Sequence, residues 1–282
     1  KLLLLTSIFV NIGLLGFFKY FNFFIETINR FFFKVGFSNI DWMEVALPIG
    51  VSFYTFQTLS YSIDIYRGNL KPVKSILDFA FFVSFFPQLV AGPIERASHL
   101  LPQILKRRKF DNKVAIEGVH LIVWGMFKKV VIADSLAPMV DDIFTNYQDF
   151  GGGTLLLGAI YFSFQIYCDF SGYSDIAIGT SKLFGFELMS NFKFPYFSRN
   201  IGEFWSKWHI SLSTWFRDYL YIPLGGSKGS KWFKVRNTFI IFLVSGFWHG
   251  ANWTYILFGF LHGIYYIPLI LKGTMNKKKK LH

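Results

Sequence analysis

The sequence has little charge and almost no cysteine. Of its 282 residues, 16% are charged, 52% are hydrophobic and 21% are aromatic, whereas a soluble domain carries about 25% charged residues. The single cysteine, Cys168, excludes an internal disulfide and a zinc site built on several cysteines. No base stands beside it in the sequence, so we interpret it as a packing residue. The shortage of charge and the long apolar runs predict a membrane protein that crosses the bilayer several times.

Several catalytic signatures are also missing. The chain has no GxGxxG dinucleotide motif, no Walker lysine motif and no HExxH zinc motif. Its two halves share no pattern of broken helices, which argues against a transporter built from inverted repeats. We therefore predict neither a metal site nor a bound cofactor.

Acidic residues are outnumbered by basic ones, 17 to 29, which gives a formal net charge of +12. The basic residues cluster at 96–113, 182–236 and 272–280, whereas 138–152 is acidic. Basic loops of membrane proteins face the cytoplasm and favour anionic lipid head groups, so we predict the three basic regions inside and the acidic loop outside. No nucleic-acid recognition module is present, and nucleic-acid binding is not expected.

The apolar runs predict an all-α polytopic fold with re-entrant and interfacial helices. We expect one membrane-embedded domain over 1–282, belonging to a longer chain, with an interfacial segment at 20–33 and a helical layer at 182–236 on the membrane surface. Pro87 and Pro93 interrupt 77–91, which predicts a half-helix there, because proline disrupts a helix interior. The predicted spans are 2–18, 42–66, 114–139, 154–178, 237–248 and 253–271.

Two carboxylates fall inside the predicted span 154–178. Asp169 and Asp175 have no basic neighbour close in sequence. Because buried charges must be paired, we favour a structural role in which they accept backbone hydrogen bonds, and metal binding is the alternative.

Two histidines, each preceded by tryptophan, stand in the most distinctive stretch of the chain. A single amphipathic helix predicted over Glu203–Leu220 places His209 on the border between its polar and aromatic faces. His249 ends an apolar run and lies between Gly246 and Gly250. Ionisable groups at membrane depth usually face a protein interior or a cavity, so His249 is a functional candidate; two hydrogen-bonded interfacial histidines are the alternative.

A neutral imidazole in an aromatic, glycine-lined site is suited to acyl transfer. It can take the proton of a hydroxyl as that hydroxyl attacks a carbonyl, and return it to the leaving group. Transfer from a thioester to an alcohol needs little beyond this, apart from positioning and exclusion of water.

Four stretches resemble the membrane-bound O-acyltransferase family: FFPQLVAGPIER, YCDFSGYSDIAIG, SGFWHGANWTY and the run NFKFPYFSRNIGEFWSKWHISLSTWFRDYLYIPLGGS. The likeness covers about residues 48–266 and is strongest to the bacterial alginate O-acetyltransferase branch. The branch that transfers D-alanine to teichoic acids is similar in WHISLSTWFRDY and less similar in YIPLGGS.

This resemblance implies a helical bundle around a tunnel in the bacterial cytoplasmic membrane, with His249 and His209 as the family's two histidines. It implies a cytoplasmic acyl-thioester donor (acetyl-CoA or a carrier protein), an external esterase-like partner and an exported polysaccharide acceptor such as alginate. From their charge, we expect Arg217 and Lys228 to help recruit an anionic donor. The alternatives are D-alanyl transfer to teichoic acid, a transporter or flippase whose histidines relay protons, and a structural scaffold.

Overall fold

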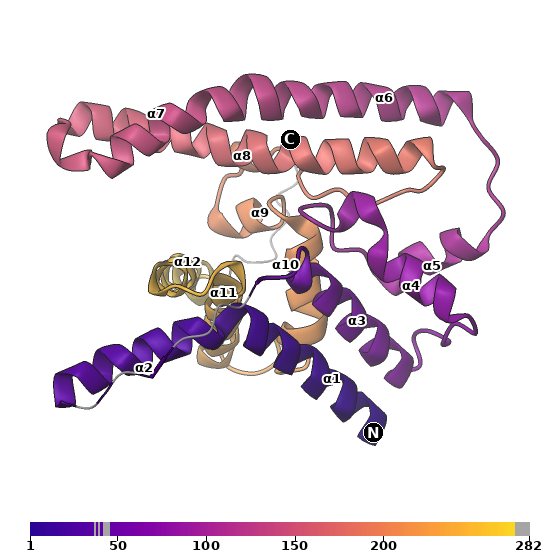
Figure 1. Ribbon diagram of the computed structural model, residues 1–282, viewed down its shortest axis with the longest axis horizontal. Helices are drawn as coiled ribbons and strands as arrows, with labels where there is room; N and C mark the ends of the chain where they lie inside the picture. Colours follow the sequence, from indigo (N-terminus) through magenta and orange to yellow (C-terminus); the bar gives the residue numbers. More distant parts are fainter. Residues whose placement is uncertain (37, 39, 42–45, 274–282) are drawn as a thin grey trace. The chain divides into compact units, whose positions relative to one another are not determined.

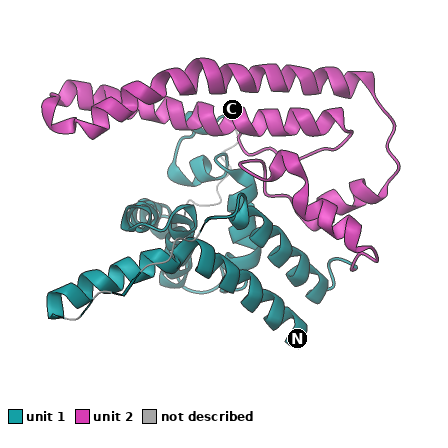
Figure 2. Cartoon of the chain, viewed as in Figure 1, with its two compact units in different colours: residues 1–71, 194–282 teal, residues 72–193 magenta. Residues whose placement is uncertain are grey.

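The computed structural model describes residues 1–36, 38, 40–41 and 46–273, and this part of the chain contains helices and no β-strand (Figure 1). The all-α prediction is therefore confirmed. The start of the predicted span 42–66, at residues 42–45, and the basic tail from 274 onward lie outside the described residues. The chain divides into two compact units, Lys1–Lys71 with Phe194–His282 and Pro72–Lys193 (Figure 2).

The first unit begins with one long helical stretch. It consists of α1 (Leu2–Leu15), a π-helical turn η1 (Gly16–Tyr20) and α2 (Phe21–Val35). The span predicted at 2–18 and the interfacial segment predicted at 20–33 are joined in this one stretch, because the helix continues past the polar residues. Glu26 and Arg30 lie one turn apart and form an ion pair at 2.6 Å, which places two charges on one face without breaking the helix.

The other helices of this unit are α3 (Val51–Tyr66), α9 (Ile201–Trp205), α10 (Ile210–Phe216), α11 (Lys231–His249) and α12 (Trp253–Leu271), with short helical turns η5 (Pro195–Phe197) and η6 (Arg217–Tyr221). Helix α3 is shorter than the predicted span 42–66 because Pro48 and Gly50, the latter at φ 76°, precede its first turn. It docks on α10 through stacked rings of Phe56 and Trp215, 3.9 Å apart, and the indole of Trp215 donates to the Phe56 carbonyl.

Helices α11 and α12 form a tightly packed hairpin. At Gly246 and Gly259 an added methyl group would overlap the backbone carbonyls of Tyr255 and Phe242 respectively. Small residues of this kind let membrane helices approach closely. Two helical stretches, Leu2–Val35 and Trp253–Leu271, are long and apolar enough to cross a bilayer.

The second unit is dominated by a long helical hairpin. One arm joins α6 (Asn112–Met126), the π-helical segment η3 (Phe127–Ala133) and α7 (Asp134–Thr145), and the other is α8 (Gly152–Leu183), with the turn η4 (Tyr147–Asp149) between them. Figure 1 shows α6 and α8 lying side by side. Glycines make this contact close: a methyl group on Gly125 or Gly179 would overlap a carbonyl of the opposite arm.

Asp169 and Asp175 are paired with lysines inside this hairpin. Asp175 binds the buried Lys128 at 2.7 Å, and Asp169 binds Lys129 at 2.5 Å. Their role in holding the two arms together is thus structural, but their partners are ammonium groups of η3 and not the backbone donors that we predicted. Cys168 is buried in α8, as the packing interpretation required.

The predicted half-helix at 77–91 is confirmed in the second unit. Helix α4 (Ile76–Ser84) has nine residues and is followed by a short 3₁₀ turn, η2 (Phe86–Gln88), that contains Pro87. At a rise of 1.5 Å per residue, nine residues extend only about 14 Å, roughly half of a bilayer core. Helix α5 (Ala97–Leu105) completes the unit.

Candidate active site

His209 does not lie in a continuous helix. The predicted helix 203–220 is broken between α9 and α10, and His209 occupies the break with φ 45° and ψ 56°. This left-handed conformation costs a residue with a side chain about 1–2 kcal/mol. The cause of the break is local, because the Ser206 hydroxyl donates to the Glu203 carbonyl, and Lys207 and Trp208 both turn back onto the Phe204 carbonyl.

The break turns the His209 side chain into the interior of the unit. Its exposed fraction is 2%, whereas the continuous helix placed it on the border of a polar face. Ser211 in α10 is fully buried as well. Burial holds the pKa of His209 well below its ordinary value, and the neighbouring His249 acts in the same direction, so its imidazole is neutral at pH 7.

The structure brings the two histidines together. The ring centroids of His209 and His249 are 6.3 Å apart, and the ring of Trp248 lies 6.1 Å from His209. His249 is the last residue of α11, and its side chain is exposed. One imidazole is therefore enclosed while the other, adjacent to it, can be reached.

Two residues that our reading of the sequence missed contact the end of α11. The Tyr20 hydroxyl donates to the Phe247 carbonyl at 3.0 Å, and the Lys19 ammonium donates to the Trp248 carbonyl. Lys19 also donates to the Ser52 hydroxyl of α3 at 3.1 Å. The sequence did contain a signal that could have identified Lys19 as a candidate, because it is a lone lysine within an aromatic, apolar run.

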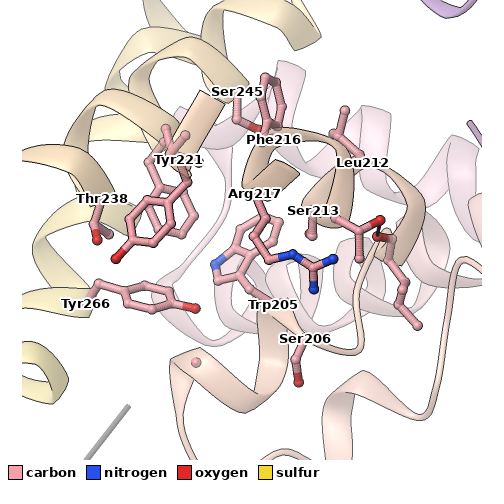
Figure 3. Close-up of a pocket in the computed structure, with 15 residues that line it drawn as sticks. Trp205, Ser206, Leu212, Ser213, Phe216, Arg217, Tyr221, Thr238, Ser245 and Tyr266 are labelled. Carbon is pink, nitrogen blue, oxygen red and sulfur yellow. Dashed lines mark hydrogen bonds between the residues drawn. The ribbon is translucent and has the colours of Figure 1, made fainter. Parts of the chain in front are cut away.

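A pocket of about 320 Å³ lies between α9, α10, η6, α11 and α12, and neither histidine is among its lining residues (Figure 3). Ser245 lines it one helical turn before His249, a rise of about 6 Å along α11. Its wall is mainly apolar, with hydroxyl groups at intervals. The polar lining residues are Ser206, Ser213, Thr214, Arg217, Tyr221, Thr238, Ser245 and Tyr266.

The two basic candidates occupy different positions. Arg217 is among the lining side chains of this pocket (Figure 3). Its guanidinium binds the carboxylate of Asp218 through two hydrogen bonds, at 2.7 and 3.2 Å. Lys228 is exposed in the loop between η6 and α11 and does not line the pocket. Only Arg217 therefore lies beside the site, and its charge is largely balanced by Asp218.

Metal-binding geometry is absent from the described residues, since no group of three or more His, Cys, Asp or Glu side chains is placed to hold an ion. The arrangement instead provides a neutral buried imidazole, an accessible imidazole and an adjacent apolar pocket. This set of groups is suited to proton transfer during attack on an acyl carbon.

Comparison with known proteins defines the class of this all-helical chain. The chain belongs to the membrane-bound O-acyltransferase family, whose model matches residues 68–272. It is 46% identical over 93% of its length to the probable alginate O-acetylase AlgI of Pseudomonas aeruginosa and 40% identical over 94% to a peptidoglycan O-acetyltransferase of Helicobacter pylori. It is 34% identical over 82% to a teichoic acid D-alanyltransferase of Streptococcus thermophilus.

The chain spans about half the length of these relatives: 50% of the Pseudomonas protein, 54% of the Helicobacter protein and 58% of the Streptococcus protein. The higher identity to the O-acetylating relatives confirms the branch indicated by YIPLGGS. The membrane character inferred from composition is confirmed at the level of the family.

Proposed function

We propose that this chain forms the acyl-transfer region of an O-acetyltransferase in the bacterial cytoplasmic membrane. The reaction joins an acceptor hydroxyl to the acetyl carbon of a thioester: the C–O bond forms, the C–S bond breaks, and the proton moves from the hydroxyl to the sulfur. The observation that carries this proposal is the contact between an accessible histidine at the end of a helix and a buried neutral one.

His249 is the general base in this proposal. Its exposed imidazole takes the hydroxyl proton during attack and returns it to the departing thiolate, a contribution of typically 10²–10⁴-fold. His209, enclosed behind it, orients the His249 ring or the substrate. An imidazole accepts a proton only in its neutral form. If the His249 imidazole is neutral near pH 7, it can act as the base without first losing a proton.

The pocket beside Ser245 is the proposed place of the donor's acyl arm. A largely apolar lining with scattered hydroxyl groups accommodates a flexible chain that carries few charges, as the arm of a thioester does. Acetyl-CoA and an acylated carrier protein both present such an arm. Because Asp218 neutralises Arg217, recruitment by charge falls mainly to the exposed Lys228 and its basic loop. If this steering operates, the KM for the donor rises with salt.

The acceptor side follows from the relatives. Proteins named for alginate and peptidoglycan O-acetylation suggest a polysaccharide outside the cell, reached directly or through an external esterase-like partner. The enzyme would then cross the membrane several times, with the donor on the cytoplasmic side. D-alanyl transfer remains the second candidate because of the teichoic acid D-alanyltransferase relative.

The test is donor turnover by the full-length protein in detergent, with acetyl-CoA, acetylated carrier protein and D-alanylated carrier protein assayed in parallel. We expect release of thiol and O-acetyl product with an acetyl donor, and loss of both in His249→Ala. Turnover of the D-alanyl donor alone would favour the second candidate. No turnover with any donor, in protein that binds its partner or moves substrate, would favour the scaffold or transporter alternative.

A further inference from the structure

The C-terminal end of α11 lacks a backbone cap. Gly250 follows His249 in an extended conformation, φ −167° and ψ 150°, and within the described chain no later N–H returns to the last carbonyls. By contrast α12 is closed by the N–H of Lys272 on Pro268 and Ile270. The last four carbonyls of a helix need partners from elsewhere, so α11 depends on side chains.

Helix α1 and its π turn supply these partners. Lys19 and Tyr20, consecutive in η1, reach the consecutive carbonyls of Trp248 and Phe247. The Tyr20 ring also stacks on Phe247 at 4.1 Å, which fixes the two segments side by side. π-helical turns occur frequently at functional sites, where they reposition side chains that a regular α-helix would direct elsewhere.

Lys19 is also a positive charge without an acid beside it. Among the described residues, no carboxylate lies within ion-pair distance of its ammonium, which binds the Trp248 carbonyl and the Ser52 hydroxyl. Glu26, two turns further along the same helix, is occupied by Arg30. The negative end of the α11 dipole stabilises an imidazolium at its last residue, and the Lys19 charge opposes this effect.

We infer that Lys19 is a positioning residue of the acyl-transfer site: together with Tyr20 it caps α11 and fixes the imidazole of His249, and its ammonium keeps that imidazole neutral and able to accept a proton. This rests on the proposed role of His249. Three other rings lie close to His249, those of His209, Trp248 and Phe258. None of them is charged, because burial keeps the His209 imidazole neutral.

Three substitutions separate the cap from the charge. Lys19→Met removes both, Lys19→Gln keeps hydrogen-bond donors without the charge, and Lys19→Arg keeps both. Lys34→Met, on the exposed end of α2, is the matched control for loss of one lysine from the same helix. All are made in the full-length protein and normalised to membrane-inserted enzyme.

The readouts are kcat, the KM for the acyl thioester and the acidic limb of the pH–rate profile. For Lys19→Met we expect kcat to fall about 10- to 100-fold, the range that follows from losing one charge-assisted hydrogen bond, with a nearly unchanged KM. The acidic limb should move to higher pH. Lys19→Gln should recover part of kcat but keep the shifted limb, Lys19→Arg should restore both, and Lys34→Met should match the wild type.

Tyr20→Phe tests the cap independently, because it removes one hydrogen bond and no charge. We expect a smaller fall in kcat and an unmoved acidic limb. Wild-type kcat and an unmoved limb in Lys19→Met would overturn the inference, as would a loss that Lys19→Arg fails to restore in correctly inserted protein. Failure of the proposed function would give a different result. In that case His249→Ala would retain its turnover, or the wild type would have none, regardless of the results for the Lys19 variants.

Discussion

The imidazole rings of His209 and His249 lie 6.3 Å apart, one enclosed by the protein and the other accessible at the end of a helix. They come from separate segments: His209 lies in the break between α9 and α10, and His249 ends α11. We propose different tasks for the two rings, because a substrate would reach only the accessible one.

His249→Ala is expected to abolish acyl transfer while the protein still folds and inserts. Loss of a general base costs 10²–10⁴ in rate, or about 3–5 kcal/mol of activation free energy. The measurement is acetyl transfer per inserted molecule. His120→Ala, on the exposed face of α6, is the matched control and should retain activity. Near-normal turnover in His249→Ala would remove it from the catalytic role.

His209→Ala and His209→Gly should differ in stability and agree in activity. Both remove the ring, so turnover should fall equally, and less than in His249→Ala. Glycine accepts the positive φ of this position without strain, so the glycine variant should be more stable by about 1 kcal/mol. Thermal unfolding in detergent measures the difference. Equal stabilities would mean that the left-handed conformation is not retained.

Gly246→Ala should destabilise the α11–α12 hairpin. The added methyl group meets the Tyr255 carbonyl, and overpacking of this kind costs typically 1–3 kcal/mol. Gly13→Ala in α1 is the control, because nothing lies within 4 Å of its added methyl group and alanine favours a helix. We expect a lower Tm for the first variant and an equal or higher Tm for the second; the reverse order would contradict the close helix contact.

A pH-dependent stabilisation is expected from His99 in the second unit. Its hydrogen bond to the buried Glu95, 2.7 Å long, raises the pKa of His99 above its ordinary value, against the lowering effect of burial. A raised pKa in the folded state adds stability below about pH 6.5, and this is lost as pH rises through the folded value. His99→Gln should remove this component from unfolding measured between pH 5.5 and 8. An unchanged pH dependence in that variant would exclude the pair as its source.

The charge pattern predicts the membrane orientation. After replacement of Cys168, a cysteine at Lys228 should react with an impermeant thiol reagent only from the cytoplasmic side, and one at Asp149 only from outside. Both positions are exposed. Labelling of the Lys228 position from outside would reverse the assignment.

Local sequence patterns determined the class of this protein, its helical fold and its two candidate histidines. Apolar runs, prolines at 87 and 93, and the tryptophan–histidine pairs are properties of short segments, and they predicted the half-helix α4 and the placement of His249 at the end of a helix. The amphipathic periodicity at 203–220 predicted one continuous helix. This prediction was wrong, because hydrogen bonds around Ser206 outweigh the weak preference of an amphipathic pattern.

Only the tertiary structure decided which distant groups meet. Nothing in the sequence connects His209 with His249, Lys128 with Asp175, or Lys19 with the end of α11, since each pair depends on the packing of separate helices. The same packing encloses His209, leaves His249 accessible and places Lys19 where it caps the end of α11. The neighbours of a side chain set its protonation state and its accessibility, and those neighbours are fixed only when the chain has folded.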